Sequence, residues 1–543
     1  MIPQQPSSFL ARALRGGPGR LLWLTLMLII AMTPMVAAQG TPEPRDGGTL
    51  VVSIASDPGH FNPAITTGFT QHVVADSMFN GLVGLDANLQ PVPDLAESWE
   101  ISDDGRVYTF YLRPDVAWHD GMPFTSADVK FSFEEVLLKY HSRTAAGLGA
   151  VLESIETPDD LTVVMTFTGP YAPLLRRLDV TEAPIIPKHI YEGIEDPTTA
   201  EANLKPVGTG PFKFVAYAQG DQVTLEANED YFKEGLPRLD RVVFRVIPEA
   251  NSALQALQSG EVDYAWNVTP AQIQLLQASP DLETATASAS PGGALCINTM
   301  AFNLENEPLD QLEVRQAIYH ALDRERMLEQ IQFGAGKIAT GPISSAMSDF
   351  YSADVTAYPY DPERAMELLD DAGLTPDENG VRLTLVFPHP NTFDRYGELI
   401  REQLGAVGIA VEDVSLDFNA ATDRVFLDRD FDLAIVSYCN GADPEIGVRR
   451  VYDSRNIRPI PFSNAAAYSN PEVDALFDEA ATTLNADERA AHYAEIQRIL
   501  TADVPYMWLI ETEGIRAFRP EFHDFKHWSG HFAETAWTEN AAE

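Results

Sequence analysis

Residues 242–266 read VVFRVIPEANSALQALQSGEVDYAW, and this stretch decides the fold class. It opens with β-branched and aromatic residues and ends on a short apolar run, which together predict two strands. Between them, Leu254 and Leu257 have the spacing of one helix face, with Asn251 placed to cap its start and Gly260 to end it. A strand–helix–strand unit is the building block of a parallel sheet, so the sequence predicts an α/β fold.

A second unit of the same kind is expected after residue 382. It has a strand at 383–387, an amphipathic helix, and strands near 409–414 and 431–438. The other expected elements are a strand from residue 49, a hairpin turning at 102–105, helices at 128–139, 473–483 and 487–500, a helix starting at 361–363, and a strand at 506–510.

The composition limits the classes of partner. The chain has 543 residues, which is too long for one core and predicts two or three domains. Its 80 acidic residues against 37 basic ones give a formal net charge of -43. A polyanion of this strength is repelled by nucleic acid and by anionic lipid, so we expect no nucleic-acid partner and no peripheral membrane role.

The first 38 residues have the layout of a secretory signal peptide. A basic region with three arginines precedes an apolar run at 21–32, and Val36-Ala37-Ala38 supplies the small side chains needed for cleavage after Ala38. The apolar run is shorter than the about 20 residues of a membrane span. We expect a secreted protein, periplasmic or extracellular, with a flexible Pro- and Gly-containing leader at 39–48; an uncleaved anchor is the alternative.

The two cysteines give little direct information. Cys296 and Cys439 lie 143 positions apart, and neither stands at the cleavage site where a lipoprotein needs one. One disulfide is permitted outside the cytoplasm. Because the spacing fits neither a CxxC motif nor a zinc site, we expect free, buried thiols.

Motifs for catalysis or metal binding are weak. Trp118-His119-Asp120-Gly121 resembles a catalytic dyad only superficially, and no nucleophile motif is present. His523, His527 and His531 could share a helical face, but Pro520 and Gly530 argue against a helix there. We expect no enzymatic activity, no metal and no cofactor.

Four stretches carry a resemblance to a known family: GGTLVVSIASDPGHFNP at 47–63, residues 93–134, residues 207–217 with 247–266, and residues 297–327 with 360–373. In this order, behind a signal peptide, they resemble the extracytoplasmic solute-binding proteins of family 5, the peptide and nickel class that feeds ATP-binding-cassette (ABC) importers. The resemblance implies a two-lobed, type II, cluster C-like periplasmic-binding-protein fold with an extra inserted domain. One lobe would comprise 46–75, 206–289 and 509–543, the inserted domain 76–205, and the second lobe 290–508, with a hinge near 290 and 508.

The resemblance also places the ligand in the cleft between closing lobes. Tyr438 takes the position of a family tryptophan, and the amine-binding aspartate of peptide binders falls on Gly441 or is deleted. The basic positions used by some members fall on Ile435 and near 387–389. The charge anchors for an ordinary zwitterionic peptide are therefore missing, which favours a modified peptide or amino-acid conjugate.

The remaining candidate ligand residues form three groups. The loop after the expected strand keeps Tyr438, Cys439, Asn440 and Asp443, although Asp443 matches a more structural Asp-Pro element of the family. Arg449 and Arg450 belong to a basic cluster with Tyr452, Arg455 and Arg458. This cluster could recognise a carboxylate or phosphate; the alternative is pairing with Asp428, Asp430 and Glu445. His60 and Phe69 could face the cleft; the alternative is packing within their loop.

These observations predict a monomeric binding protein that captures a peptide-like, opine-like or oligosaccharide solute and delivers it to ABC permease subunits. A binding protein signals only if its ligand binds the closed and open forms with different affinity. Two alternatives remain: a secreted hydrolase, which would need paired carboxylates or a nucleophile in the cleft, and a ligand sensor serving a membrane receptor.

Overall fold

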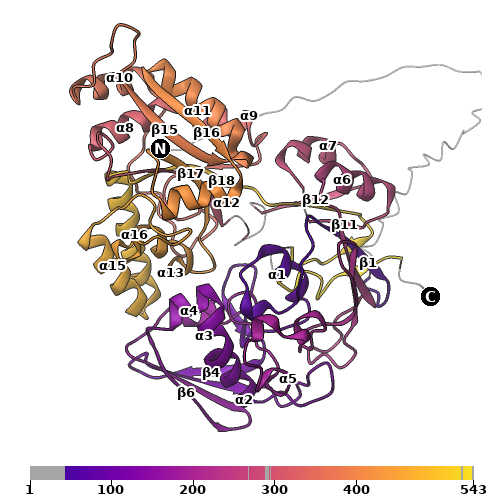
Figure 1. Ribbon diagram of the computed structural model, residues 1–543. Coiled ribbons are helices and arrows are strands. Elements are labelled where there is room, and N and C mark those ends of the chain that lie inside the picture. Colours follow the sequence, from indigo (N-terminus) through magenta and orange to yellow (C-terminus); the bar gives the residue numbers. More distant parts are fainter. Residues whose placement is uncertain (1–42, 267, 288–292, 294, 528–529, 541–543) are drawn as a thin grey trace, which may run out of the picture. The chain divides into compact units, whose positions relative to one another are not determined.

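The structure is a computed structural model that describes residues 43–266, 268–287, 293, 295–527 and 530–540. The expected signal peptide at 1–38 and residues 39–42 of the expected leader lie outside the described residues. Within the described ranges, no helix is both long enough and apolar enough to cross a membrane. Figure 1 shows a mixture of helices and sheets along the whole described chain.

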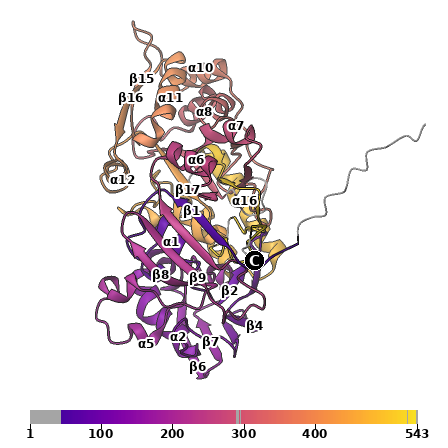
Figure 2. The ribbon, with the colours of Figure 1, turned by 90° about the vertical axis from the view of Figure 1, so that its right-hand side faces the viewer.

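A seven-stranded sheet contains the opening stretch of the sequence. Strand β1 (Thr49–Ile54) lies between β10 (Arg241–Val246) and β11 (Tyr264–Ala265) and runs parallel to both. Helix α6 (Ala250–Ser259) connects β10 to β11, so the predicted strand–helix–strand unit is confirmed. The remaining strands of this sheet are β8 (Phe212–Ala218), β9 (Gln222–Ala227), β12 (Glu283–Thr286) and β19 (Ile515–Phe518), and β1, β8 and β9 are visible in Figure 2.

Of the two ends predicted for α6, only the C-terminal end is confirmed. Gly260 ends the helix with a φ of 76°, in the left-handed region that glycine adopts without steric cost. The residue that precedes the first turn is Glu249, not Asn251 as predicted. The Asn251 side chain instead accepts a hydrogen bond from the Gln272 amide at 3.1 Å, so a partner distant in sequence replaces the local cap.

The predicted hairpin belongs to an antiparallel sheet of four strands. Strands β4 (Ala96–Ile101) and β5 (Val107–Leu112) pair across the turn, and β7 (Thr162–Phe167) and β6 (Leu152–Asp159) extend the sheet. The helix predicted at 128–139 is confirmed as a continuous helical run. It comprises α2 (Ser126–Phe131), a π-helical turn (Ser132–Leu137) and α3 (Leu138–Tyr140). Its start is fixed by a reciprocal capping box between Thr125 and Asp128.

The second predicted strand–helix–strand unit is also confirmed. Strands β15 (Leu383–Pro390) and β16 (Ile409–Leu416) are parallel, and α11 (Asp394–Ala406) lies beside them (Figure 1). The strand expected near 431–438 is β17 (Leu433–Cys439), which joins a separate antiparallel sheet with β13 (Cys296–Phe302), β18 (Tyr506–Thr512) and β14 (Gly336–Ile338).

The other helices pack against one another, as α8 does with α10 and α15 with α16, or against strands, as α9 and α12 do. Their bounds are α1 (Phe69–Ala75), α4 (Ser142–Leu148), α5 (Lys188–Tyr191), α7 (Ile273–Gln277), α8 (Leu312–Ala321), α9 (Arg324–Gln330), α10 (Pro362–Asp371), α12 (Phe418–Thr422), α13 (Pro444–Gly447), α14 (Arg449–Tyr452), α15 (Pro471–Thr482) and α16 (Ala486–Asp503). The predicted tail helices and the helix start at Asp361 are therefore confirmed. Two large hydrophobic cores result, one drawn from residues 297–510 and the other from residues between 50 and 536.

Candidate functional site

Strand β17 and the segment that follows it hold most of the predicted ligand residues. Tyr438 is buried, and its hydroxyl donates to the Ser463 carbonyl at 3.2 Å. Because successive residues of a strand face opposite sides, Cys439 is exposed. The chain then passes through residues 440–443 into α13 and α14.

The expectation of free, buried thiols is wrong. Cys296 and Cys439 form a disulfide, and they are directly opposite each other in the pairing of β13 with β17. Cys296 is only partly buried and Cys439 is exposed. Sequence spacing could not reveal this bond, because the register of two strands 143 residues apart creates the pair. The bond attaches the start of the candidate loop to β13.

Asn440 and Asp443 fix the course of this loop. The buried Asn440 side chain accepts from the Ser344 N–H at 2.7 Å and donates to the Pro342 carbonyl at 3.0 Å. The fully buried Asp443 carboxylate accepts two bonds from Arg489, both at 2.7 Å. The Asn440 amide and the Asp443 carboxylate, both predicted to bind the ligand, are therefore hydrogen-bonded within the protein.

The Asp443–Arg489 pair is a buried, bidentate ion pair. Burial works to raise the pKa of Asp443, but the charge and hydrogen bonds of Arg489 outweigh it and the pKa lies below its usual value. Asp443 also accepts from the Glu445 N–H at 3.0 Å and so caps the short helix α13. This pair holds the start of α13, and hence α14, in one place.

Arg449 is fully paired within its own segment. It contacts Glu445 at 2.8 Å and Asp453 at 3.0 Å, and it also pairs with Asp478. Arg455 bonds the same two aspartates, Asp453 at 2.6 Å and Asp478 at 2.9 Å. We call these five residues the paired arginine network. Of the predicted alternative partners, Glu445 contributes, whereas Asp428 and Asp430 do not.

Arg450 differs from Arg449 in having no counter-ion in the described structure. It has neither a hydrogen bond nor an ion pair with any residue in the described part of the chain, and its Nε is buried without a partner. Burial lowers the pKa of this guanidinium; nearby Tyr438 and Glu182 oppose that shift, and Arg143 adds to it. Glu182 and Arg143 come from a distant part of the chain, where Arg143 Nε contacts Glu182 Oε1 at 3.0 Å.

The chain around Arg143 meets the candidate loop directly. Arg176 donates to the Ala442 carbonyl at 3.4 Å, and Arg177 donates to the Glu445 carbonyl at 3.0 Å. The Ala172 N–H donates to the Ala481 carbonyl at 2.9 Å. These contacts bring residues 143–182 against the segment that carries Arg450.

His60 and Phe69 lie in a third region, near α1. His60 is partly buried, where its Nδ1 accepts from the Asn62 N–H at 3.3 Å, and burial lowers its pKa. The Phe69 side chain is 67% exposed, and its ring centroid lies 6.4 Å from that of Trp266. The buried Trp266 Nε1 has no partner in the described structure. An exposed aromatic ring beside such a group is suited to binding an apolar ligand part.

Sequence reasoning missed Arg143, Glu182, Trp266 and Arg489. Trp266 ends the stretch that decided the fold, so its place at a strand end was a usable signal. Arg489 lies 46 residues after Asp443, and Glu182 lies 39 after Arg143. No local pattern indicates pairs at such separations.

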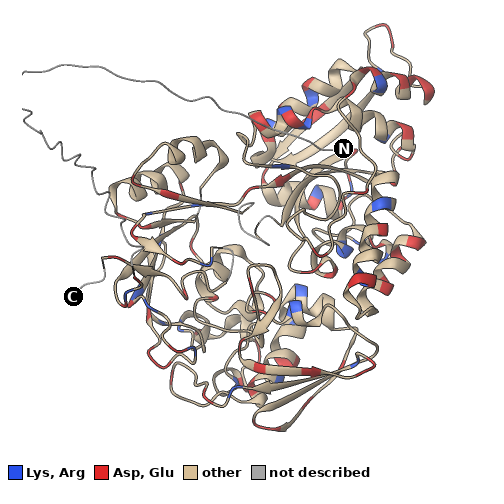
Figure 3. Ribbon diagram, turned by 180° about the vertical axis from the view of Figure 1, so that it is seen from behind, with Lys and Arg blue, Asp and Glu red and all other residues tan. Residues whose placement is uncertain are grey.

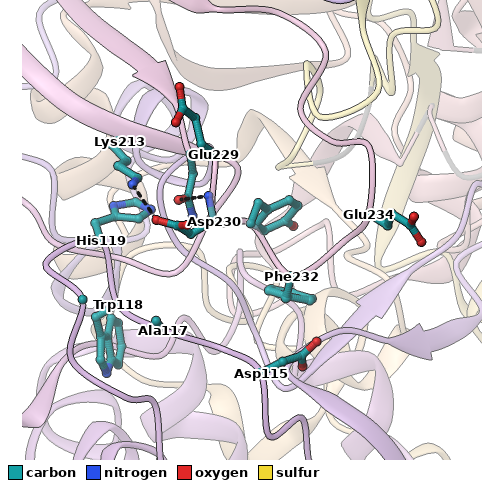
Figure 4. A pocket seen from close by; sticks show the side chains of 12 residues that line it. Asp115, Ala117, Trp118, His119, Lys213, Glu229, Asp230, Phe232 and Glu234 are labelled. Atoms are coloured by element: carbon teal, nitrogen blue, oxygen red, sulfur yellow. Dashed lines mark hydrogen bonds and ion pairs between the residues drawn. The ribbon is translucent and has the colours of Figure 1, made fainter.

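A cavity of about 530 Å³ is lined by none of the predicted ligand residues (Figure 4). It is lined by His119, by Lys213 with Asp230 at 3.8 Å, and by further acidic side chains. His119 Nε2 bonds the Gly210 carbonyl at 3.0 Å and its Nδ1 accepts from the Gly208 N–H at 3.2 Å. Burial lowers the pKa of His119 to about 4, so the ring is neutral and serves the local fold.

The C-terminal histidines do not come together. His523 contacts Glu539 at 3.0 Å, His527 contacts the Tyr264 hydroxyl at 2.9 Å, and His531 contacts the Phe79 carbonyl at 2.7 Å. Among the residues that the structure describes, no group of three or more histidine, cysteine or acidic side chains is placed to hold a metal ion. Acidic positions are spread over the ribbon rather than gathered in one segment (Figure 3).

Comparison with known proteins identifies the fold class and then the family. The periplasmic binding protein DppA of Helicobacter pylori, solved with the peptide STSA, has a TM-score of 0.77 and 26% identity, covering 91% of this chain and 99% of that one. The fold is the two-lobed, mixed α/β, type II fold of periplasmic binding proteins. The model of bacterial extracellular solute-binding proteins, family 5 Middle, matches residues 90–458, and the chain belongs to this family.

Curated relatives match over most of their length. Heme-binding protein A of Haemophilus influenzae is 30% identical over 510 residues, which cover 89% of this chain and 90% of that protein. A glutathione-binding protein of Pectobacterium atrosepticum is 29% identical over 466 residues, covering 84% of this chain and 88% of the relative. The family consists of solute-binding proteins, as the sequence predicted.

Proposed function

We propose that this protein is the extracytoplasmic solute-binding component of an ABC importer and carries a peptide-like or amino-acid-conjugate solute. The observation that carries this proposal is the whole-chain correspondence to a periplasmic, ABC-transporter-associated protein solved with a bound peptide. Di/tripeptide-binding protein 3 of Pseudomonas aeruginosa, at 28% identity over 93% of this chain, supports the same class of solute.

The proposal includes the division of the chain into parts. Residues 46–75, 206–289 and 509–543 form one lobe, 76–205 an inserted domain and 290–508 the other lobe. The sheets support this division, because the seven-stranded sheet draws its strands from the first set, and β13, β14, β17 and the first part of β18 come from the last. We place the hinge near residues 290 and 508, the second of which lies within β18.

The proposal extends to place and partners. The protein is exported to the periplasm or medium after cleavage behind Ala38, acts as a monomer without catalysis, and delivers its solute to permease subunits. Closure around the solute is the signal, since a ligand shifts the lobes only by its differential affinity for the two forms. The hydrogen bond from Arg177 to the Glu445 carbonyl, at 3.0 Å, joins the proposed inserted domain to the proposed second lobe.

A thermal-shift screen tests the proposed function. The full chain, expressed for export and refolded to remove any carried solute, is screened with tripeptides, glutathione, opines, oligosaccharides and nickel–histidine. A solute at a hundred times its dissociation constant should stabilise the protein by about 2.7 kcal/mol. A clear shift with a peptide-like compound supports the proposal. A folded protein that responds only to an oligosaccharide or a nickel chelate would contradict the proposed class of solute.

A further inference from the structure

Arg450 is a cation that the fold places without a counter-ion. The protein has 80 acidic residues for 37 basic ones, so carboxylates are abundant. The neighbouring Arg449 contacts three of them. Arg450 contacts none within the part of the chain that the structure describes, and its Nε is shielded from water. Burying a cation without a partner costs free energy, and nothing in the local sequence requires this cost.

The charged groups nearest Arg450 have partners of their own in the described structure. Arg143 neutralises Glu182 through a contact at 3.0 Å, which leaves the Arg450 charge in excess. Nearby His141 adds no positive charge, since burial lowers its pKa to about 3. His72 is paired with Asp76 at 2.8 Å. An anionic group of the solute would give Arg450 the counter-ion that it lacks in the described structure.

The backbone segment that carries Arg450 is fixed before any ligand arrives. Its helix, α14, follows α13, whose start is held by the bidentate Asp443–Arg489 pair. The disulfide at Cys439 and the two hydrogen bonds of Asn440 hold the preceding loop. Because the backbone that carries Arg450 is already held, binding has to order only its side chain, which lowers the entropic cost of recognising a planar anion.

We infer that Arg450 binds a carboxylate of the transported solute, and that the solute is a peptide-like conjugate with a free carboxylate. This inference rests on the proposed function and deepens it. A carboxylate matches the guanidinium through two parallel hydrogen bonds and supplies the counter-ion that Arg450 lacks in the described structure. Arg449 has no such role, because its donors are taken by Glu445, Asp453 and Asp478.

The test uses Arg450→Gln and Arg450→Lys with Arg458→Gln as the matched control. Arg458 lies in the same segment and is exposed, and its side chain hydrogen-bonds only Asn456 in the described structure. The refolded full chain is titrated calorimetrically with glutathione, trialanine and agropinic acid, with the methyl ester of each, and with inorganic phosphate. Melting of the unliganded variants comes first, and Arg450→Gln should melt at the same temperature as the unaltered protein or higher, because it removes a partly buried cation that has no ion pair.

Free-carboxylate probes should bind the unaltered protein and Arg458→Gln alike, and Arg450→Gln about thirtyfold or more weakly, the loss typical of removing one partner of a buried charge pair. Arg450→Lys should bind these probes with an affinity between those of the unaltered protein and Arg450→Gln, since lysine keeps the charge but lacks the planar pair of donors. Esters should bind weakly and equally to all proteins.

Three outcomes would overturn the inference. Equal binding of a free-carboxylate probe by Arg450→Gln would reject the role of Arg450 and leave the proposed function standing. Binding of phosphate but of no carboxylate probe would reject the class of anion. Absence of binding by every probe to the unaltered protein would reject both the inference and the proposed solute class.

Discussion

Two adjacent arginines show how one segment can support the fold and receive a ligand. Arg449 belongs to the paired arginine network, where Glu445, Asp453 and Asp478 surround its guanidinium. Arg450 faces Tyr438 and has no counter-ion within the described structure. The two residues are of the same type and are adjacent in sequence. The difference in their pairing therefore arises from which face of α14 each side chain occupies. A charge that is already neutralised stabilises the fold, and one that is not is available to a solute.

The largest expected effect comes from breaking the Asp443–Arg489 ion pair, which holds the start of α13. Asp443→Asn leaves Arg489 buried without its counter-ion, and we expect a loss of about 3–5 kcal/mol in the free energy of unfolding. Urea denaturation measures it. Asp478→Asn is the matched control, because its carboxylate is half-exposed, and should cost about 1 kcal/mol or less. Unchanged stability of Asp443→Asn with loss of solute binding would instead place Asp443 in contact with the ligand.

Asp179, which interacts with Glu182, should make the stability of the protein depend on pH. Burial, and then the charges of Glu182 and Asp76, raise the pKa of Asp179 to about 7. The folded protein then keeps a proton between about pH 4 and 7 that the unfolded chain releases, so this group's contribution to stability falls as pH rises through that window.

Asp179→Asn removes this penalty. The variant should be more stable than the unaltered protein at pH 8, by on the order of 1–4 kcal/mol, and the difference should vanish toward pH 4. Thermal melting across this pH range measures it. A variant that is equally stable at both ends of the range would show that the Asp179 carboxyl ionises normally.

The smallest effects separate the two arginines directly. Arg449→Gln removes charged hydrogen bonds from a partly buried network and should cost about 1–3 kcal/mol of stability. Arg450→Gln should leave the unliganded protein at least as stable as the unaltered protein, because it removes a partly buried cation without a partner. Parallel urea denaturation of both variants without solute is sufficient. Equal losses would mean that Arg450 also supports the fold, and the contrast between them would disappear.

Much of the fold could be predicted from sequence because its signals are local. The strand–helix–strand units around 242–266 and 383–416 follow from periodicity and from Gly260, and both are present. The misplaced cap at Asn251 has a physical reason, since Gln272 binds that side chain. Local propensity loses to a tertiary hydrogen bond in this case.

The candidate site was less predictable because its decisive contacts are distant in sequence. The disulfide depends on the register of β13 and β17, and the anchor of Asp443 comes from α16. The basic cluster was visible in the sequence, but which of its members lacks a partner was not. That distinction required the positions of Asp453, Asp478 and Glu182 around the two guanidinium groups.

The most direct test of the central claim is to identify the solute that the protein carries. The full chain, expressed for export and purified without denaturant, is unfolded, and the released small molecules are identified by mass spectrometry. We predict a peptide-like compound with a free carboxylate that rebinds the refolded protein and binds Arg450→Gln more weakly. A neutral sugar or a metal chelate that rebinds both proteins equally would contradict this account.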